Sequence, residues 1–222
     1  MFALILAIVL AIASPAPATT VTGIPLDAPW KVTVYNLVHP GFKHPAWGWQ
    51  HAERNYDLAM ELAKGDGLTI DTDVLFAACM LHDMAAFPPY QGKGEHGDVA
   101  AQKSEPILRA AGFPMEKFPK VAAAMRGHMY YSNPGTVPEA IVLHDADSLD
   151  FLGAIGETRM ISLTGADGES AARQIATLRT FVRDIPPKLI TKTAKKMGAE
   201  RVAELQTFLN DWQRETFNGQ LP

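Results

Sequence analysis

The sequence predicts an all-α protein, a single-domain bundle of about six or seven helices. Apolar residues from position 48 onward recur at intervals of three and four, which is the spacing of an amphipathic helix. Residues that favour a β-strand cluster only in KVTVYNLV at 31–38. The 222 residues, of which 47% are hydrophobic and 20% charged, suffice for one globular core. These observations favour a helical bundle over a fold that contains a sheet.

Two helices are expected in the first part of this domain. The first ends near KGDG at 64–67, and its inward stripe comprises His51, Asn55, Leu58 and Leu62. The second begins at a cap within 71–73, and one of its faces comprises Val74, Ala78, Leu81 and His82. FPPYQGKG at 87–94 is expected to be a loop, because paired prolines and glycines stop a helix.

Further helices are expected in the rest of the chain, at residues 96–111, 115–130, 169–184 and 193–217. TVPE at 136–139 reads as a capping box with a proline in the first turn. It opens a long apolar segment that continues to Glu157. Together these segments account for the six or seven helices.

The first residues have the features of a secretory signal peptide. An apolar run from Phe2 to Ala13 precedes two helix-breaking prolines and a small-x-small pattern that ends at Ala18. The run is short for a bilayer span, which needs about 20 apolar residues. We expect cleavage after Ala18 and a secreted or periplasmic protein with no remaining membrane span; an uncleaved N-terminal anchor is the alternative. The expected organisation is a signal peptide at 1–18, an N-terminal extension at 19–47 and a helical domain at 48–222.

Charge and cysteine content narrow the classes of partner and fold. The formal net charge is −4 and no block of Lys or Arg occurs, so a nucleic acid polymer is not expected as a partner. Cys79 is the only cysteine, so no intramolecular disulfide can form, and its thiol is expected to act as a small buried hydrophobe. We expect a monomer or a small homo-oligomer.

A histidine and an aspartate stand side by side at the end of an apolar segment, in CMLHDMAAF at 79–87. Adjacent residues on a helix point about 100° apart, so His82 and Asp83 cannot both belong to one buried stripe. A carboxylate in apolar surroundings is costly unless it is paired or bound to a metal. His51 and Asp147 also lie on apolar helix faces, and one divalent metal ion would satisfy all of these side chains. Imidazole nitrogen and carboxylate oxygen leave Mn, Fe, Co, Ni, Zn and Mg open as its identity.

Taken in order, these residues resemble the HD-domain metal-dependent phosphohydrolase superfamily. The order is His51, then His82-Asp83, then an Asp within DADSLDFLGAIGETR at 145–159. More narrowly, the sequence resembles the small single-domain bacterial HD hydrolases, in which the first His begins an H-x-x-R stretch, here HAER. The resemblance covers about residues 45–215 and implies an all-helical HD fold.

The resemblance also implies roles for individual residues. The metal ligands it implies are His51, His82, Asp83 and Asp147. The dipeptide HD occurs again at His144-Asp145, but only the first pair follows a His-bearing helix and precedes an acidic motif. Asp83 or Asp145 would orient the attacking water, which the metal would activate by lowering its pKa. His128 or His96 would neutralise or protonate the leaving group.

Phosphate also requires basic side chains, which hold it and offset its developing charge. The candidates are Arg54, Lys93 and Arg126, each of which has a solvated surface charge as its alternative. Arg54 matches the H-x-x-R stretch, Lys93 lies in the Gly-rich loop, and Arg126 lies two residues before His128. Ser148 occupies a position that is often basic in relatives, which leaves the size of the substrate open.

We therefore expect an exported metal-dependent phosphohydrolase that uses metal-activated water. Its substrate would be a phosphate ester of a nucleotide or a related small molecule. Two alternatives stay open. In an HD-type di-iron oxygenase, His96 and His128 would join the other four ligands around two irons. In a non-catalytic periplasmic binding protein, the helical core would persist without turnover.

Overall fold

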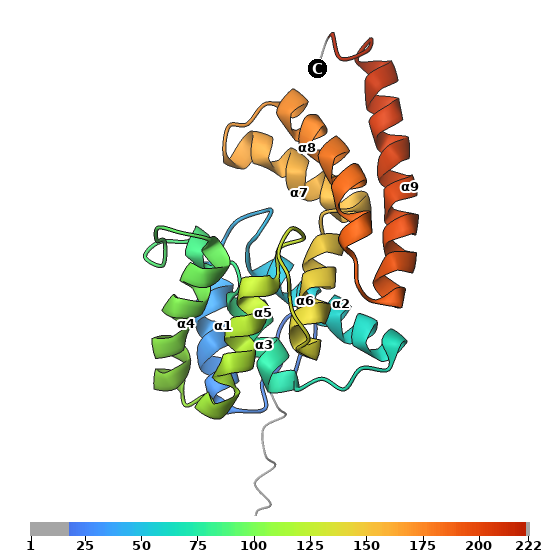
Figure 1. Ribbon diagram of the computed structural model, residues 1–222. Coiled ribbons are helices and arrows are strands. Elements are labelled where there is room, and N and C mark those ends of the chain that lie inside the picture. The colour runs from blue at the N-terminus through green and yellow to red at the C-terminus, as the bar shows by residue number, and fades with distance from the viewer. Residues whose placement is uncertain (1–17, 221–222) are drawn as a thin grey trace, which may run out of the picture.

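The computed structural model describes residues 18–220 and confirms the all-α fold (Figure 1). Within these residues lie nine α-helices, three 3₁₀ turns and one isolated β-bridge between Thr19 and Pro25. The helices are α1 (Pro29–Gly41), α2 (Trp49–Asp66), α3 (Thr72–Leu81), α4 (His96–Ala111), α5 (Phe118–Gly127), α6 (Pro138–Leu149), α7 (Gly153–Ala166), α8 (Ala171–Asp184) and α9 (Lys192–Glu215). The 3₁₀ turns are Met84–Ala86, Met115–Lys117 and Pro186–Lys188.

Local signals placed α2, α3 and α4 close to where the structure has them. The Asp71 side chain caps α3 as expected, because it accepts hydrogen bonds from the backbone N–H of Asp73 at 3.1 Å and of Val74 at 3.5 Å. After α2, Gly67 adopts φ 67°, a left-handed conformation that glycine reaches without strain. These boundaries follow from side chains and glycines within a few residues of the helix end.

The strand-like segment at 31–38 is a helix in the structure, part of α1. Trp30, Val34 and Val38 recur every four residues and are all buried. Their stripe packs on the core, where the Trp30 ring meets Phe76 edge-on with centroids 5.6 Å apart. Burial of this helical stripe outweighs the weak strand preference of β-branched residues. Part of the N-terminal extension therefore shares the core of the domain.

The apolar segment after residue 136 also differs from expectation. It is broken between Leu149 and Gly153, where Gly153 adopts φ 65°, so it forms α6 and α7 in place of one continuous element. The expected capping box does not form: Val137 is the N-cap of α6 and no side chain caps it. The Glu139 carboxylate instead accepts a hydrogen bond at 2.7 Å from the backbone N–H of Asp71. This break and α1 explain why the described residues contain more helices than expected.

The helices form two groups that meet at α6 (Figure 1). In the first group, α2, α3, α5 and α6 pack together, and α1 and α4 pack on them. In the second, α7, α8 and α9 pack together, and α9 also contacts α2 and α6. One continuous cluster of buried apolar side chains runs through both groups. A side chain at the junction can therefore contact elements from each group.

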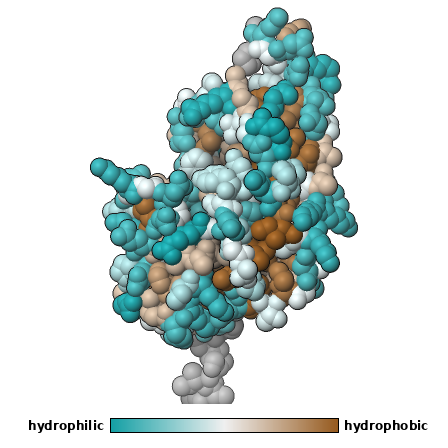
Figure 2. Space-filling view, viewed as in Figure 1, coloured by the Kyte–Doolittle hydropathy of each residue, from teal (hydrophilic) through white to brown (hydrophobic). Residues whose placement is uncertain are grey.

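The outer surface is largely polar on the face shown in Figure 2, with an apolar patch between α6 and the start of α9. Across residues 18–220, no helix combines the length and the apolar character required to cross a membrane. The signal peptide expected at 1–18 lies outside the described residues, apart from Ala18.

Asp66 at the end of α2 anchors the start of α9. Its carboxylate accepts hydrogen bonds from the backbone N–H of Lys192 at 2.8 Å and of Thr193 at 2.8 Å, and from the Thr193 hydroxyl at 2.5 Å. The hydroxyl contact is the main reason why the pKa of Asp66 lies below its ordinary value of 3.8. A long-range contact thus satisfies the first backbone donors of the last helix.

We expect Asp66→Ala to lower the free energy of unfolding at pH 7 by about 1 kcal/mol, the usual cost of losing a helix cap. Because the pKa of Asp66 is depressed on folding, its stabilisation is present above pH 3.8 and is lost as pH falls through the folded-state pKa. Urea unfolding of wild type and variant should differ at pH 7 and converge in acid. Glu200→Ala, on the exposed face of α9, is the control; an Asp66→Ala deficit that is the same at both pH values would contradict the assignment.

Candidate metal centre

Four polar side chains from three helices meet at the junction of the two groups. His51 lies in the first turn of α2, His82 and Asp83 follow the end of α3, and Asp147 lies on α6. The His51 Nε2 atom is 3.2 Å from Nε2 of His82 and 3.1 Å from Oδ1 of Asp147. Asp83 Oδ2 is 3.3 Å from Nε2 of His82. The structure therefore brings together the four residues that the sequence analysis selected as metal ligands.

The end of α3 explains how two adjacent residues face one centre. The helix ends at Leu81, and Asp83 leaves it with φ −96° and ψ 8°. His82 is fully buried, whereas the Asp83 side chain is 19% exposed and borders a cavity. Leaving helical geometry at this point allows both side chains to turn to the same centre.

Each imidazole of this group has its Nδ1 atom engaged by an oxygen. His82 Nδ1 donates to the backbone carbonyl of Cys79 at 2.8 Å, and His51 Nδ1 donates to Asp150 Oδ2 at 2.6 Å. Such bonds fix the ring orientation and place the lone pair of a neutral ring on Nε2. Both Nε2 atoms therefore point to the centre and can bind a metal ion when the rings are neutral, and the Asn55 side-chain amide also lies 3.1 Å from Nε2 of His51.

Asp83 also faces a second pair of histidines. His96, the first residue of α4, and His128, directly after α5, have Nε2 atoms 2.8 Å apart. Asp83 Oδ1 lies 3.5 Å from Nε2 of His96 and 3.7 Å from Nε2 of His128. His128 Nδ1 donates to the carbonyl of Met125 at 2.5 Å, which again leaves Nε2 for the centre. Two groups of potential ligands thus share one carboxylate.

The residues fit a divalent cation on two observations. The Nε2 atoms of His51 and His82 face each other at 3.2 Å, and two neutral lone pairs at that distance repel unless a cation or a proton lies between them. Asp147 Oδ2 is buried without a hydrogen-bond partner. A buried oxygen in that state carries a desolvation cost that a metal ion would remove. Nitrogen and oxygen donors together suit a divalent transition metal or Mg²⁺.

The electrostatics of the centre add to this fit. Burial raises the pKa of Asp83 and Asp147, but neighbouring imidazoles outweigh it and hold both below the ordinary value of 3.8, His82 chiefly for Asp83 and His51 for Asp147. Burial lowers the pKa of His82, but the charge of Asp83 outweighs it and raises that pKa to about 9. Burial and the charge of His82 lower the pKa of His128 to about 4. Both carboxylates are thus anions at neutral pH and attract a cation.

A buried ion network orients His51. Asp150, which accepts from His51, also accepts from Nε of Arg54 at 3.1 Å and from its Nη2 at 2.9 Å. Arg159 Nη1 lies 3.2 Å from Asp150 Oδ2, and Arg159 Nε donates to the carbonyl of Ala46 at 2.5 Å. Arg54 was expected at the substrate phosphate; in the structure its guanidinium is bonded to Asp150, because both lie beside the His51 ring.

Sequence reasoning missed Asp150 and Arg159 as site residues. A signal for Asp150 was available, since it lies three residues after Asp147 and so on the same face of a helix. Arg159 ends the DADSLDFLGAIGETR run, but its contact with the centre depends on how α7 packs. Only the first of these two positions had a local signal.

The structure places Asp145 away from the centre, which corrects its expected role at the attacking water. Its carboxylate is fully buried and accepts hydrogen bonds from the backbone N–H of Ile190 at 3.0 Å and of Thr191 at 2.7 Å. Residues two apart on a helix point about 200° apart, so Asp145 and Asp147 face opposite sides of α6. Asp145 holds the segment before α9.

The other two basic candidates have different positions. Lys93 is exposed on the loop between α3 and α4. Arg126 is 56% exposed, and its Nε lies 2.9 Å from Oδ1 of Asp98. Arg126 also borders a cavity of about 260 Å³ that reaches His96 and His128. The structure therefore places Arg126 near the second pair of histidines and leaves Lys93 in solvent.

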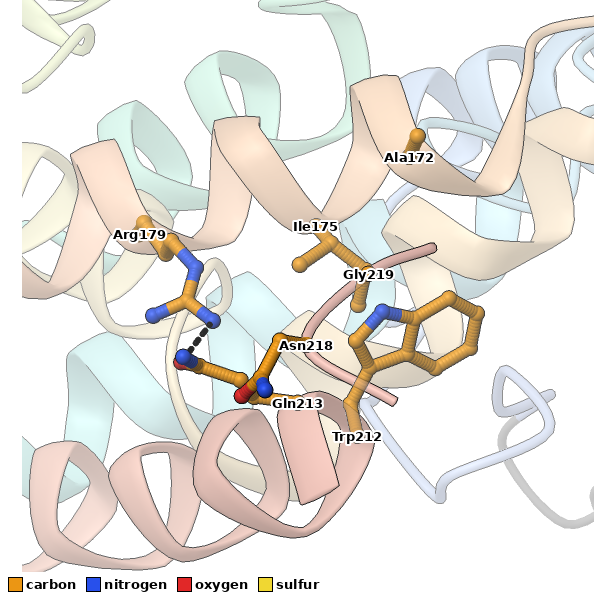
Figure 3. Close-up of a pocket in the computed structure, with 7 residues that line it drawn as sticks. All are labelled: Ala172, Ile175, Arg179, Trp212, Gln213, Asn218 and Gly219. Atoms are coloured by element: carbon orange, nitrogen blue, oxygen red, sulfur yellow. Dashed lines mark hydrogen bonds between the residues drawn. The ribbon is translucent and has the colours of Figure 1, made fainter. Parts of the chain in front are cut away.

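Two further hollows differ in their chemistry. One, of about 300 Å³, has Asp83, His96 and Asp147 in its lining, so it opens onto the candidate centre. The other, of about 360 Å³, lies between α8 and α9, where Arg179 donates to Gln213 at 3.2 Å (Figure 3). The described residues that line this second hollow include no histidine or carboxylate. Of these two cavities, the first alone is lined by candidate metal ligands among the described residues.

Comparison with known proteins finds a family match over the part of the chain that contains this centre. Residues 48–152 match the HD domain family, and this range contains both pairs of histidines, Asp83 and Asp147. The sequence has no significant match among curated proteins.

Solved structures of bacterial proteins have a similar fold. A Lactobacillus plantarum protein is 22% identical, with a TM-score of 0.67 over 84% of this chain and 96% of that one. YpgQ of Bacillus subtilis, in complex with ADP, is 19% identical, with a TM-score of 0.65 over 83% of this chain and 97% of YpgQ. A predicted HD superfamily hydrolase from an uncultured Thermotogales bacterium is 24% identical, with a TM-score of 0.61 over 85% and 94%. At these identities the likeness is one of fold.

We expect Asp150→Asn to weaken Mn²⁺ binding by roughly 10- to 100-fold, the usual effect of removing a carboxylate that orients a metal-ligating imidazole. The smaller charge on the Asp150 side chain would hold the His51 ring less firmly. Titration calorimetry of the metal-free protein measures the affinity. Asp184→Asn, an exposed carboxylate that pairs with Arg183, is the matched control; equal Mn²⁺ affinity in the two variants would refute the orienting role.

Proposed function

We propose that this chain, which belongs to the HD-domain superfamily, is a metal-dependent phosphohydrolase that cleaves a phosphate ester of a small molecule. The observation that carries the proposal is the convergence of His51, His82, Asp83 and Asp147, with an unpartnered buried oxygen on Asp147. Export, predicted from the first eighteen residues, is part of the proposal.

Each part of the centre has a task in this reaction. A divalent metal bound by the four residues would lower the pKa of water and polarise the phosphoryl group. Asp83 borders the cavity and accepts a hydrogen bond from the attacking water, which orients it. In a centre that holds one metal, His96, whose side chain is 34% exposed, would donate a proton to the leaving oxygen. The buried network around Asp150 keeps the His51 ring in the same orientation during the reaction.

The relatives support the hydrolase class and leave the substrate open. YpgQ binds ADP in its crystal structure, and a nucleotide is one phosphate ester of the proposed class. Its 19% identity is a likeness of fold, so its ligand is a guide to the choice of assay.

A second candidate function is favoured by the second group of ligands. Asp83, His96 and His128 offer ligand atoms within 4.8 Å of one another, as do His51, His82 and Asp83. Two irons that share a carboxylate are the requirement of the di-iron oxygenase alternative. Such an enzyme would contain about two Fe per chain and consume O₂, whereas a hydrolase would release phosphate without O₂.

We expect His82→Ala and Asp83→Ala each to lower phosphate release by more than about 100-fold, because each removes a ligand of the metal that activates water. Metal content should fall while the helical circular-dichroism signal persists. His39→Ala, a histidine on α1 that packs against Trp49 away from the centre, is the matched control. Undiminished phosphate release in the His82 and Asp83 variants would refute the proposal; nucleotide binding without turnover in wild type would support the non-catalytic alternative.

The second candidate function predicts two metal ions per chain in wild type and one in His128→Ala, since this substitution removes a ligand of the second group only. Elemental analysis of protein reconstituted separately with Mn²⁺ and Fe²⁺ gives the ratio. A ratio of one in both proteins would show that His96 and His128 do not bind a metal. Oxygen consumption by the iron form without phosphate release would favour the oxygenase.

A further inference from the structure

We propose that the substrate carries a single phosphoryl group on a compact apolar body, as an aryl or alkyl phosphate monoester does, and that Trp47, Phe151 and Phe181 select that body. The inference rests on the proposed function and specifies the substrate class of the same site. It comes from the shape and charge of the cavity of about 300 Å³ that opens onto the centre.

The cavity is lined by four polar side chains and otherwise by apolar residues. Asp83, His96 and Asp147 belong to the candidate centre, where a phosphoryl group would bind, and Arg159 is the fourth. Three aromatic residues and two methionines supply most of the apolar lining; these are Trp47, Phe151, Phe181, Met129 and Met160. A site of this composition favours a ligand with an apolar body and one precisely placed polar group.

The aromatic walls are held in place by neighbouring rings. The centroids of Phe151 and Phe181 are 4.8 Å apart, and the Trp47 ring stacks on His44 with centroids 4.1 Å apart. The His44 Nε2 atom lies 3.4 Å from Oδ1 of Asp167, which ties the Trp47 loop to the end of α7. Ring faces fixed in this way offer stacking contacts to a planar group.

Among the described residues that line the cavity, Arg159 is the one Lys or Arg, so cations for additional phosphates are few. Its Nε donates to the carbonyl of Ala46, and its Nη1, which forms no hydrogen bond, lies 3.2 Å from Asp150 Oδ2, whose charge it offsets. The guanidinium also lies over the Phe151 ring, 4.4 Å from the centroid. Each further phosphate of a nucleoside di- or triphosphate would need Lys, Arg or Mg²⁺ partners of its own. One phosphoryl group can be met by the metal centre alone.

The volume of the cavity also favours a small ligand with a single phosphoryl group. A volume of about 300 Å³ stands at the lower limit of ligand sites, which span roughly 300–1,000 Å³. The neighbouring cavity of about 260 Å³ contains Arg126, but Asp98 and Glu95 border it and oppose a second anion there. The site therefore suits a small monoester.

The selecting residues lie mostly outside the part of the chain that matches the HD domain. Trp47 precedes residues 48–152, and Phe181 lies on α8 after them. The metal-binding groups lie inside that range. The chemistry and the choice of substrate are therefore carried by different segments of this chain.

The test compares two phosphonates on Mn²⁺-loaded protein by titration calorimetry. Benzylphosphonate and methylphosphonate share a head group and have no ester bond to cleave, so the comparison measures only the body of the ligand. We expect benzylphosphonate to bind at least about tenfold more tightly, as burial of one ring in an apolar pocket implies. Trp47→Ala and Phe181→Ala should each reduce this preference to below about threefold, because they weaken benzylphosphonate binding more than methylphosphonate binding.

Phe217→Ala, whose ring is 66% exposed and does not line the cavity, should keep the full preference. The Trp47 variant is decisive if Phe181→Ala does not fold, because Trp47 is only half-buried on a loop. Equal affinity for the two phosphonates, binding of neither, or tighter binding of ADP would overturn the inference. Hydrolysis of phosphate esters without the benzyl preference would support the proposed function and refute the inferred substrate class. The benzyl preference without hydrolysis of any ester would support the inferred ligand class and refute the proposed function.

Discussion

The Asp83 carboxylate lies between two pairs of imidazole nitrogens, and the rest of the centre depends on that position. One oxygen faces His51 and His82, and the other faces His96 and His128. These five residues come from α2, from the end of α3, from α4 and from the end of α5. An anion surrounded by nitrogen lone pairs is favourable when cations occupy the spaces between them. The packing of these four helices therefore forms a centre that is stable only when positive charge lies within it.

A second ionic network ties this centre to the rest of the fold. The Asp150 carboxylate accepts hydrogen bonds from His51 and Arg54 and forms an ion pair with Arg159. Arg159 also donates a hydrogen bond to the carbonyl of Ala46. The contacts connect α2, the end of α6, α7 and the loop before α2. Breaking one partner of such a buried network leaves an uncompensated charge, so it resists rearrangement. The network that orients a ligand thus also positions the loop that bears the aromatic wall of the cavity.

The contrast between a charged centre and an apolar cavity has a chemical consequence. Apolar walls exclude water, and electrostatic interactions strengthen where water is excluded. Under the proposed function, Phe151 and Phe181 would therefore strengthen the field at the phosphoryl group as well as bind its substituent. An apolar body that fills the cavity would complete the exclusion of water, which a small hydrophilic ester would not do.

The sequence by itself determined the helical class, the helices α2, α3, α4, α8 and α9 to within a few residues, and the types and order of the candidate ligands. Those features follow from apolar spacing, caps and glycines, which act over a few residues. Only the tertiary structure decided that 31–38 is helical, that Asp145 faces away from the centre, and that Asp150 and Arg159 support His51. Each of these outcomes depends on which helix faces lie against one another, and contacts between residues from 46 to 108 positions apart set that arrangement.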